Sequence, residues 1–170
     1  MTKWFLFVLS VFWLTTAQAQ DKDILEQVRE DFQLIKGEED IERLLIVTID
    51  DTNPDANTVQ AYQAAGTCMM AEYVFSPIKK LKYFNKGKES LERSIKIEKS
   101  VETVYCRLLI QLNIPGFLNY NKEIKEDVKF FQAELPKSKI DKDYKEIMKK
   151  NLVTLAKKED IKKSLLDIDL

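Results

Sequence analysis

Histidine is absent from the 170-residue sequence, and glycine, proline and cysteine are scarce. Without histidine, the chain lacks both the usual base that activates a catalytic serine or cysteine and the commonest metal ligand. Four glycines and four prolines supply little of the turn chemistry that an all-β fold needs. The 27 basic and 28 acidic residues nearly cancel, so no net positive charge indicates nucleic-acid binding. These absences favour a helical protein that uses no cofactor and binds no nucleic acid.

A single long apolar run, residues 4–14, stands near the N-terminus. It is too short for a membrane-spanning helix, which needs roughly 20 residues. Lys3 precedes it and Ala17-Gln18-Ala19 follows it, and this order is typical of a secretory signal peptide. We therefore expect residues 1–19 to be removed on export to the periplasm or the extracellular space. Residues 20–170 should form one helical domain without stable membrane insertion.

Apolar residues recur at intervals of three and four through the rest of the chain, which is typical of helices that bury one face. Capping residues, prolines and glycines divide this pattern into predicted helices. The predicted starts are Asp21 or Asp23, Glu38, Asn53-Pro54, Ser76-Pro77, Ser100, Asn121, Ser138-x-x-Asp141 and Asp160. The apolar run at 44–49 would also suit a buried strand, but we favour helix because no partner strand is evident. The predicted class is all-α, built from antiparallel helical hairpins.

Small and large apolar residues also recur at the offsets of a known helical repeat. The first-helix positions are Tyr62, Ala65, Gly66 and Met69, the second-helix positions are Gly87, Leu91, Ser94 and Lys99, and the next first helix carries Tyr105, Leu108, Leu109 and Leu112. This spacing resembles a degenerate tetratricopeptide repeat, with about nine residues inserted between Gly66 and Gly87, Lys99 in place of proline and Leu109 in place of a small residue. The resemblance implies a right-handed superhelix with a core at about 54–135. An irregular helical bundle is the alternative.

A second resemblance covers residues 83–87, 105–108 and 114–121, which are similar to small exported bacterial proteins of uncharacterised function. It implies the same kind of helical-repeat fold and no particular activity.

The segment Asp51-x-Asn53-x-Asp55 has the alternating oxygen ligands of a calcium loop. An EF-hand needs glycine at the sixth position and glutamate at the twelfth, where this chain has Ala56 and Tyr62. We therefore expect a turn with a helix cap at this place, and no metal site.

The two cysteines, Cys68 and Cys106, could form one disulfide in an oxidising compartment. The repeat register that the resemblance implies offsets them by about five residues on neighbouring first helices, or roughly 7.5 Å along the axis. With a helix separation of about 8–10 Å, the Cα atoms would lie beyond the reach of a disulfide. The prediction is two buried free thiols.

These patterns predict a non-enzymatic module that binds a protein or peptide partner on the concave face of its helices. The predicted contacts lie on the two first helices and in the loop after Pro115-Gly116: Tyr62, Met69, Tyr73, Tyr105, Arg107, Gln111, Phe117 and Tyr120. One alternative is a small-molecule binder or an enzyme with a carboxylate-lined pocket. Another is a purely structural protein of the cell envelope.

Overall fold

A computed structural model describes residues 23–170 of the chain, and in this part every regular element is helical. The elements are α1 (Ile24–Gln33), α2 (Glu38–Leu45), α3 (Ala56–Met69), η1 (Met70–Glu72), α4 (Pro77–Ile97), α5 (Val101–Asn113), η2 (Gly116–Leu118), α6 (Ile124–Glu134), α7 (Lys142–Leu155) and α8 (Glu159–Leu166). The all-α prediction is confirmed. The predicted signal peptide, residues 1–19, lies outside the described residues.

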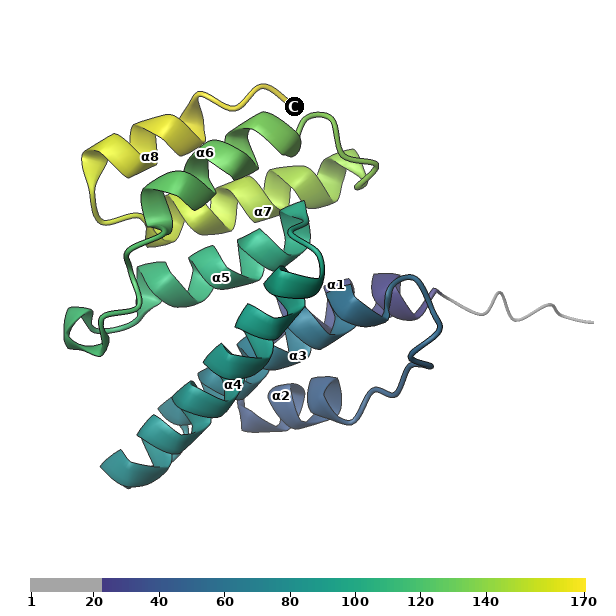
Figure 1. The fold of residues 1–170 in the computed structure, drawn as a ribbon, viewed down its shortest axis with the longest axis vertical. Helices are drawn as coiled ribbons and strands as arrows, with labels where there is room; N and C mark the ends of the chain where they lie inside the picture. The colour runs from purple at the N-terminus through teal and green to yellow at the C-terminus, as the bar shows by residue number, and fades with distance from the viewer. Residues whose placement is uncertain (1–22) are drawn as a thin grey trace, which may run out of the picture.

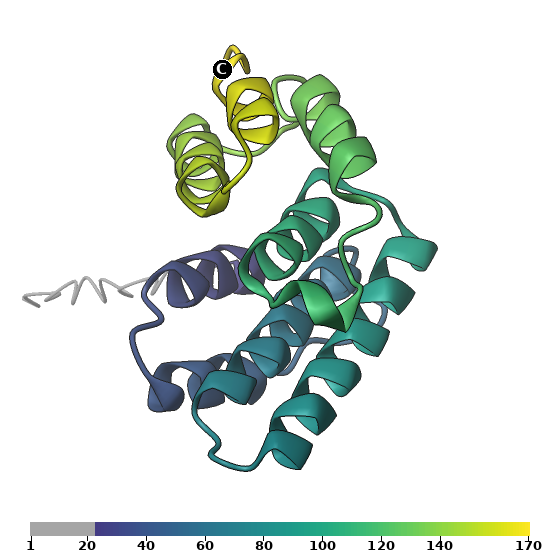
Figure 2. The same cartoon turned by 90° about the vertical axis from the view of Figure 1, so that its left-hand side faces the viewer.

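The helices form two groups that meet at α5 (Figure 1). One group holds α1 to α4, and the other holds α6, α7 and α8 at the opposite end of the molecule (Figure 2). Helix α5 packs against α3 and α4 on one side and against α6 and α7 on the other. One cluster of buried side chains runs from Leu25 in α1 to Ile168 beyond α8. The stretch of α5 from Val101 to Leu108 is therefore buried between the two groups.

Three helices begin where their capping residues predict. The Asp23 carboxylate accepts a hydrogen bond from the Leu25 N–H at 3.2 Å. Ser76 caps α4 ahead of Pro77, and Ser100 caps α5 through the Thr103 N–H. Each cap satisfies a backbone donor that the first turn leaves without a helical partner.

Helix α2 ends at Leu45, and the prediction of a helix through Ile49 was wrong. The side chain of Gln63, in α3, donates hydrogen bonds to the carbonyls of Leu44 at 3.1 Å and Val47 at 2.8 Å. These bonds satisfy two backbone acceptors at the end of α2. The chain then leaves the helix without forming a strand.

Helix α3 begins at Ala56, so the prediction that Asn53-Pro54 starts it was wrong. The Asn53 side chain instead accepts the Asp55 N–H at 2.9 Å and closes a turn before the helix. The helix ends at Met69 and passes into η1.

Two later starts also differ from the predictions. Helix α6 begins at Ile124 without a side-chain cap, and Asn121 does not cap it. Helix α7 is capped by Asp141, which accepts the Asp143 N–H at 2.8 Å, whereas Ser138 donates to the Leu135 carbonyl. The predicted capping box around Ser138 is therefore replaced by a single aspartate cap.

Helices α3 and α4 cross very closely at Gly87. A Cβ atom there would lie 2.6 Å from the Ala64 carbonyl oxygen and 2.7 Å from the Cys68 nitrogen. Gly66, by contrast, faces Leu44 in α2 and takes no part in the α3–α4 crossing.

Candidate binding groove

Five of the eight predicted contact residues are buried: Tyr62, Tyr105, Arg107, Gln111 and Tyr120. Each directs a polar atom to a partner inside the protein, so none of them offers a surface to a second molecule. The structure therefore does not place these five predicted contacts on the surface. The four on α3 and α5, and Tyr120 after η2, all face other elements of the protein.

The other three predicted contacts reach the surface to different extents. Met69 is half-buried, Tyr73 is 38% exposed and Phe117 is 80% exposed. Phe117 lies in η2, within the loop after Pro115-Gly116 in which the sequence predicted a partner contact.

Three further apolar residues are exposed to solvent, and the sequence patterns did not identify them as candidate contacts. Phe75 is fully exposed, Ile78 is 82% exposed and Leu81 is 48% exposed. Phe75 precedes the Ser76-Pro77 start of α4, and Ile78 follows it, so both lie where the chain turns at the tip of this helix. Large apolar side chains on both sides of a helix start were the signal that could have found them.

A groove of about 530 Å³ lies between the N-terminal half of α4 and the loop after α5. Its volume is within the usual range for ligand sites, roughly 300–1,000 Å³. Helix α4 supplies one wall through positions on a single helical face, and the loop supplies the other. The lining residues are Cys68, Ala71 and Glu72, then Pro77, Lys80, Leu81 and Phe84, and finally Asn113, Ile114, Pro115, Phe117 and Leu118.

The loop wall of the groove is fastened to α4 by Tyr120. Its hydroxyl donates a hydrogen bond to Glu92, and its ring packs edge-on against Phe84 with the ring centroids 6.0 Å apart. The Lys88 ammonium lies 5.7 Å from the centroids of both rings. Asn119, with φ of 50°, turns the chain between Phe117 and this anchor. The groove therefore has two walls whose separation is set by buried contacts.

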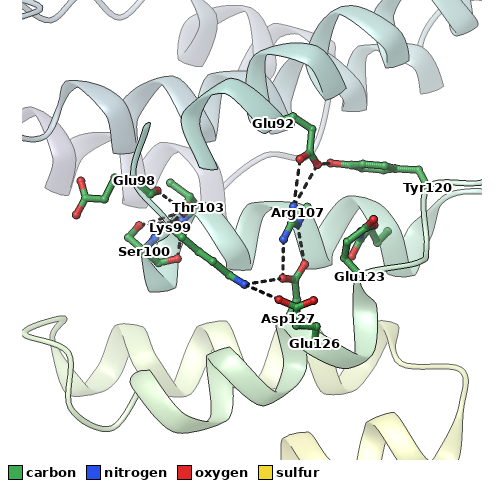
Figure 3. A network of polar contacts seen from close by, with 11 residues as sticks. Glu92, Glu98, Lys99, Ser100, Thr103, Arg107, Tyr120, Glu123, Glu126 and Asp127 are labelled. Carbon is green, nitrogen blue, oxygen red and sulfur yellow. Dashed lines mark hydrogen bonds and ion pairs between the residues drawn. The ribbon is translucent and has the colours of Figure 1, made fainter. Parts of the chain in front are cut away.

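Arg107, in α5, supports the contact between Tyr120 and Glu92 by binding Glu92 from the other side (Figure 3). Its guanidinium donates to both carboxylate oxygens of Asp127, at 2.7 and 2.6 Å, and to Glu92 at 3.1 Å. Lys99 adds a contact of 3.7 Å to Asp127. Because Glu92 is in α4 and Asp127 is in α6, Arg107 joins three helices through charge-assisted hydrogen bonds. Burial raises the pKa of Asp127, and the hydrogen bonds and charge of Arg107 oppose that rise.

A second buried network lies at the centre of the bundle. Arg29 donates two hydrogen bonds to Glu102, at 2.8 and 2.7 Å, and the Tyr62 hydroxyl donates to the same carboxylate at 2.8 Å. Since the single Tyr62 proton is used there, the Tyr144 hydroxyl donates to the Tyr62 oxygen at 2.7 Å. Four helices are joined in this way.

The cysteines do not form a reactive site. Cys68 lies at the floor of the groove, and burial raises the pKa of its thiol to about 12. Cys106 is fully buried, and burial together with the nearby Glu102 raises its pKa well above the ordinary value. A thiol with a raised pKa is a poor nucleophile at neutral pH. Both are free in the structure.

The Asp51, Asn53 and Asp55 segment forms turns, and the Asn53 oxygen is engaged by the Asp55 N–H. Between residues 23 and 170, no group of three or more cysteine, aspartate or glutamate side chains is placed to hold a metal ion. No helix in the same part of the chain combines the length and apolar character needed to cross a bilayer.

The groove has one basic and one acidic side chain among its described lining residues, Lys80 and Glu72. Lys79 and Lys82 are exposed on the side of α4 that faces away from the groove, because the lining positions 77, 80, 81 and 84 share the opposite helical face. An apolar groove with one lysine can receive apolar groups next to a carboxylate.

Comparisons with family models, with curated proteins and with solved structures find no match to this chain. The case for a function therefore depends on the groove and on the chemistry around it.

Proposed function

We propose that the protein is an exported, non-enzymatic helical module that binds a segment of a partner protein in the groove between α4 and η2. One observation carries the proposal: Phe117 is exposed on the lining of a groove that is already open, and the exposed Phe75 and Ile78 lie within two residues of Pro77, which lines the same groove. Scattered apolar residues on a surface are ordinary, but a group of them around a concave site is typical of an interaction surface.

The partner segment that fits best carries large apolar side chains flanked by aspartate or glutamate. The apolar side chains would lie against Leu81, Phe84 and Leu118, which line the groove. A carboxylate of the segment would face Lys80 on α4. Opposite charges around an apolar centre give register and selectivity more than affinity.

The arrangement of buried carboxylates supports a binding module over an enzyme. Glu102 and Asp127 each accept two hydrogen bonds from an arginine, so both are committed to holding helices together. A catalytic acid or base needs access to a substrate proton, and neither carboxylate lines the groove. A purely structural envelope protein would not need an open apolar groove.

We also propose that α3 and α4 form a tetratricopeptide-like hairpin. The glycine contact at Gly87 supports it, because small residues at the crossing are what such repeats use to bring two helices together. The resemblance of residues 1–19 to a signal peptide supports export.

Site-specific photo-crosslinking of the full chain in its native cells tests the proposal. A photoreactive amino acid in place of Phe117 or Ile78 should give one protein adduct, the same from both positions. Ile97 is the matched control, because it is 71% exposed and lies at the far end of α4, about 28 Å away along the helix. A photoreactive amino acid in place of Ile97 should give no such adduct.

Further measurements decide whether the adduct represents docking in the groove. Leu81→Asp should abolish the adduct, and Ile97→Asp should leave it unchanged. The crosslinked segment, prepared as a peptide, should bind more weakly when its acidic residues are replaced by their amides. Adducts of equal strength at Ile97, adducts only between copies of this chain, or adducts only with lipid would each contradict the proposal.

A further inference from the structure

The loop wall of the groove is fixed at both of its ends. At its start the Ile114 N–H donates to the Ile110 carbonyl at 3.0 Å, which continues the hydrogen bonding of α5. Beyond its end, Tyr120 is buried and is bound to α4 through both its hydroxyl and its ring. Movement of the loop is therefore confined to the residues between these two anchors.

The five residues between the anchors, 115–119, form hydrogen bonds only with one another. The Leu118 N–H donates to the Pro115 carbonyl, and the Asn119 N–H donates to the Gly116 carbonyl, both at 3.1 Å. Within the part of the chain that the structure describes, no hydrogen bond joins this segment to another element. Four of the five residues are exposed, and Leu118 is half-buried. A segment with so few contacts to the rest of the protein moves at a low cost in free energy.

Two residues of this segment can change their backbone conformation readily. Nothing lies within 4 Å of a Cβ at Gly116, and glycine has the widest choice of backbone conformations. Asn119 has a φ of 50°, in the left-handed region that asparagine adopts more readily than most residues. Phe117 lies between these two positions, so rotation at them moves its side chain relative to the groove.

Phe117 supplies the driving force for such a movement. Its side chain lines the groove and is nevertheless 80% exposed, which leaves a large apolar surface in water. Burial of that surface is favourable in proportion to its area. The empty groove covers only one side of the ring, whereas an apolar side chain bound in the groove would supply a second surface. Inward rotation of Phe117 is therefore favoured more strongly when the groove is occupied.

We propose that residues 115–119 form a strap that closes over the partner segment in the groove and turns Phe117 from solvent onto that segment. The inference rests on the proposed function, because the bound segment supplies the surface on which the strap closes. A segment that contacts the closed state more extensively than the open state shifts the population toward closure.

Tyr120 acts as a positioning residue for the strap. Its hydroxyl donates to Glu92, and the same carboxylate accepts a hydrogen bond from the Arg107 guanidinium at 3.1 Å. Arg107 also binds both carboxylate oxygens of Asp127 in α6, at 2.7 and 2.6 Å. The far end of the strap is thus held by α4 and α5, so residues 115–119 can swing while α6 stays in place.

The fluorescence of a single tryptophan tests the strap. Both tryptophans of the sequence, Trp4 and Trp13, lie within the predicted signal peptide, and every described helix lies in residues 24–166. Phe117→Trp therefore gives the processed chain, residues 20–170, one fluorophore at the centre of the strap. Glu89→Trp is the matched control, because Glu89 is exposed in the middle of α4.

In the free chain, the tryptophan at position 117 should lose fluorescence anisotropy faster on the nanosecond timescale than the tryptophan at position 89. The crosslinked segment, added as a peptide, should slow this loss, shift the emission to shorter wavelength and reduce quenching by acrylamide. These changes should occur at position 117 and not at position 89. In the wild type, the same peptide should slow hydrogen exchange at the Leu118 and Asn119 amides, which repeats the measurement without a substitution.

Tyr120→Phe removes the hydroxyl that fastens the strap and keeps the ring. This variant should release the peptide roughly threefold to tenfold faster, the range expected for one hydrogen bond, with an unchanged association rate. Tyr83→Phe is the matched control, because Tyr83 is half-buried in α4 and its hydroxyl has no hydrogen-bond partner among the described residues. The control should bind and release the peptide as the wild type does.

Calorimetric titration of the wild type with the same peptide separates a failure of the strap from a failure of the proposed function. An absence of binding heat would remove the proposed function and the strap together. Normal binding heat without any change in hydrogen exchange at Leu118 and Asn119 would overturn the strap alone. Equal anisotropy decay at positions 117 and 89 in the free chain, or release from Tyr120→Phe at the wild-type rate, would also overturn it.

Discussion

Gly87 in α4 lies against Cys68 in α3, so closely that a Cβ atom on Gly87 would be 2.5 Å from the Cys68 sulfur. The backbone atoms of Ala64 and Cys68 are almost as near, at 2.6 and 2.7 Å from the same point. A side chain can move away from an added methyl group, but these backbone atoms are fixed by the hydrogen bonds of α3. The two helices therefore have to separate if position 87 gains a side chain.

Gly87→Ala should lower the free energy of unfolding by about 2–3 kcal/mol. Alanine favours a helix over glycine by roughly 1 kcal/mol, so a net loss would come from the crossing and not from helix propensity. Urea unfolding followed by circular dichroism measures the change. Gly37→Ala is the control, because nothing lies within 4 Å of a Cβ at Gly37. Equal stability of the two variants would refute the close crossing.

The Arg107–Asp127 pair gives a second prediction. Asp127→Asn leaves the buried guanidinium without its bidentate partner, and such a loss typically costs about 3–5 kcal/mol. Denaturant unfolding again measures it. Glu126→Gln is the matched control, because Glu126 is next in sequence, is 77% exposed and contacts only Lys99 among its described ion pairs.

The control should change stability by less than about 0.5 kcal/mol, as exposed ion pairs usually do. The double variant Arg107→Met/Asp127→Leu should be more stable than Asp127→Asn, since it removes the charge along with its partner. A small effect of Asp127→Asn, comparable to that of the control, would show that the network does not hold α6 to α5.

Local signals in the sequence were sufficient for the starts of α1, α4 and α5, whereas the end of α2 depends on a long-range contact. Ser76 and Ser100 cap the helices that follow them, because a cap involves only neighbouring residues. The end of α2 depends on Gln63, which is 19 residues from Leu44, and no local pattern indicates that contact.

The candidate contacts were misplaced for a related reason. Arg107 stands among apolar residues in the middle of α5, which is the sequence mark of a buried ion pair, but its partners Glu92 and Asp127 are 15 and 20 residues away. Their identity requires the fold. Phe117 could be selected from the sequence because a large apolar residue is unusual in a loop such as the one after Pro115-Gly116.

Reaction of the thiols gives a third prediction. The folded protein should react very slowly with a thiol reagent at pH 8, because burial raises the pKa of both Cys68 and Cys106. After denaturation without reductant, two thiols per chain should react at once. Fewer than two would mean that the cysteines are oxidised, and no reaction at all would establish a disulfide between them.

Alkaline pH gives the last prediction. Burial raises the pKa of six acidic groups in the folded protein: Tyr62, Cys68, Tyr105, Cys106, Tyr120 and Tyr144. The ordinary values are 9.0 for cysteine and 10.0 for tyrosine, so above about pH 9 the unfolded chain loses protons that the folded chain keeps. The free energy of unfolding should therefore fall as pH rises from 9 toward 12, by up to about 1.4 kcal/mol per pH unit for each proton retained.

Urea unfolding at pH 8, 9, 10 and 11 measures this fall. The variant Cys68→Ala/Cys106→Ala should start from a lower stability, because two buried side chains are shortened, but its decline should begin near pH 10, where only the tyrosines contribute. The comparison uses the slope with pH, which is independent of the starting stability. A wild-type stability that stays level between pH 9 and 11 would mean that these side chains are open to water in the folded protein, and the buried networks around Glu102 and Glu92 would have to be abandoned with them.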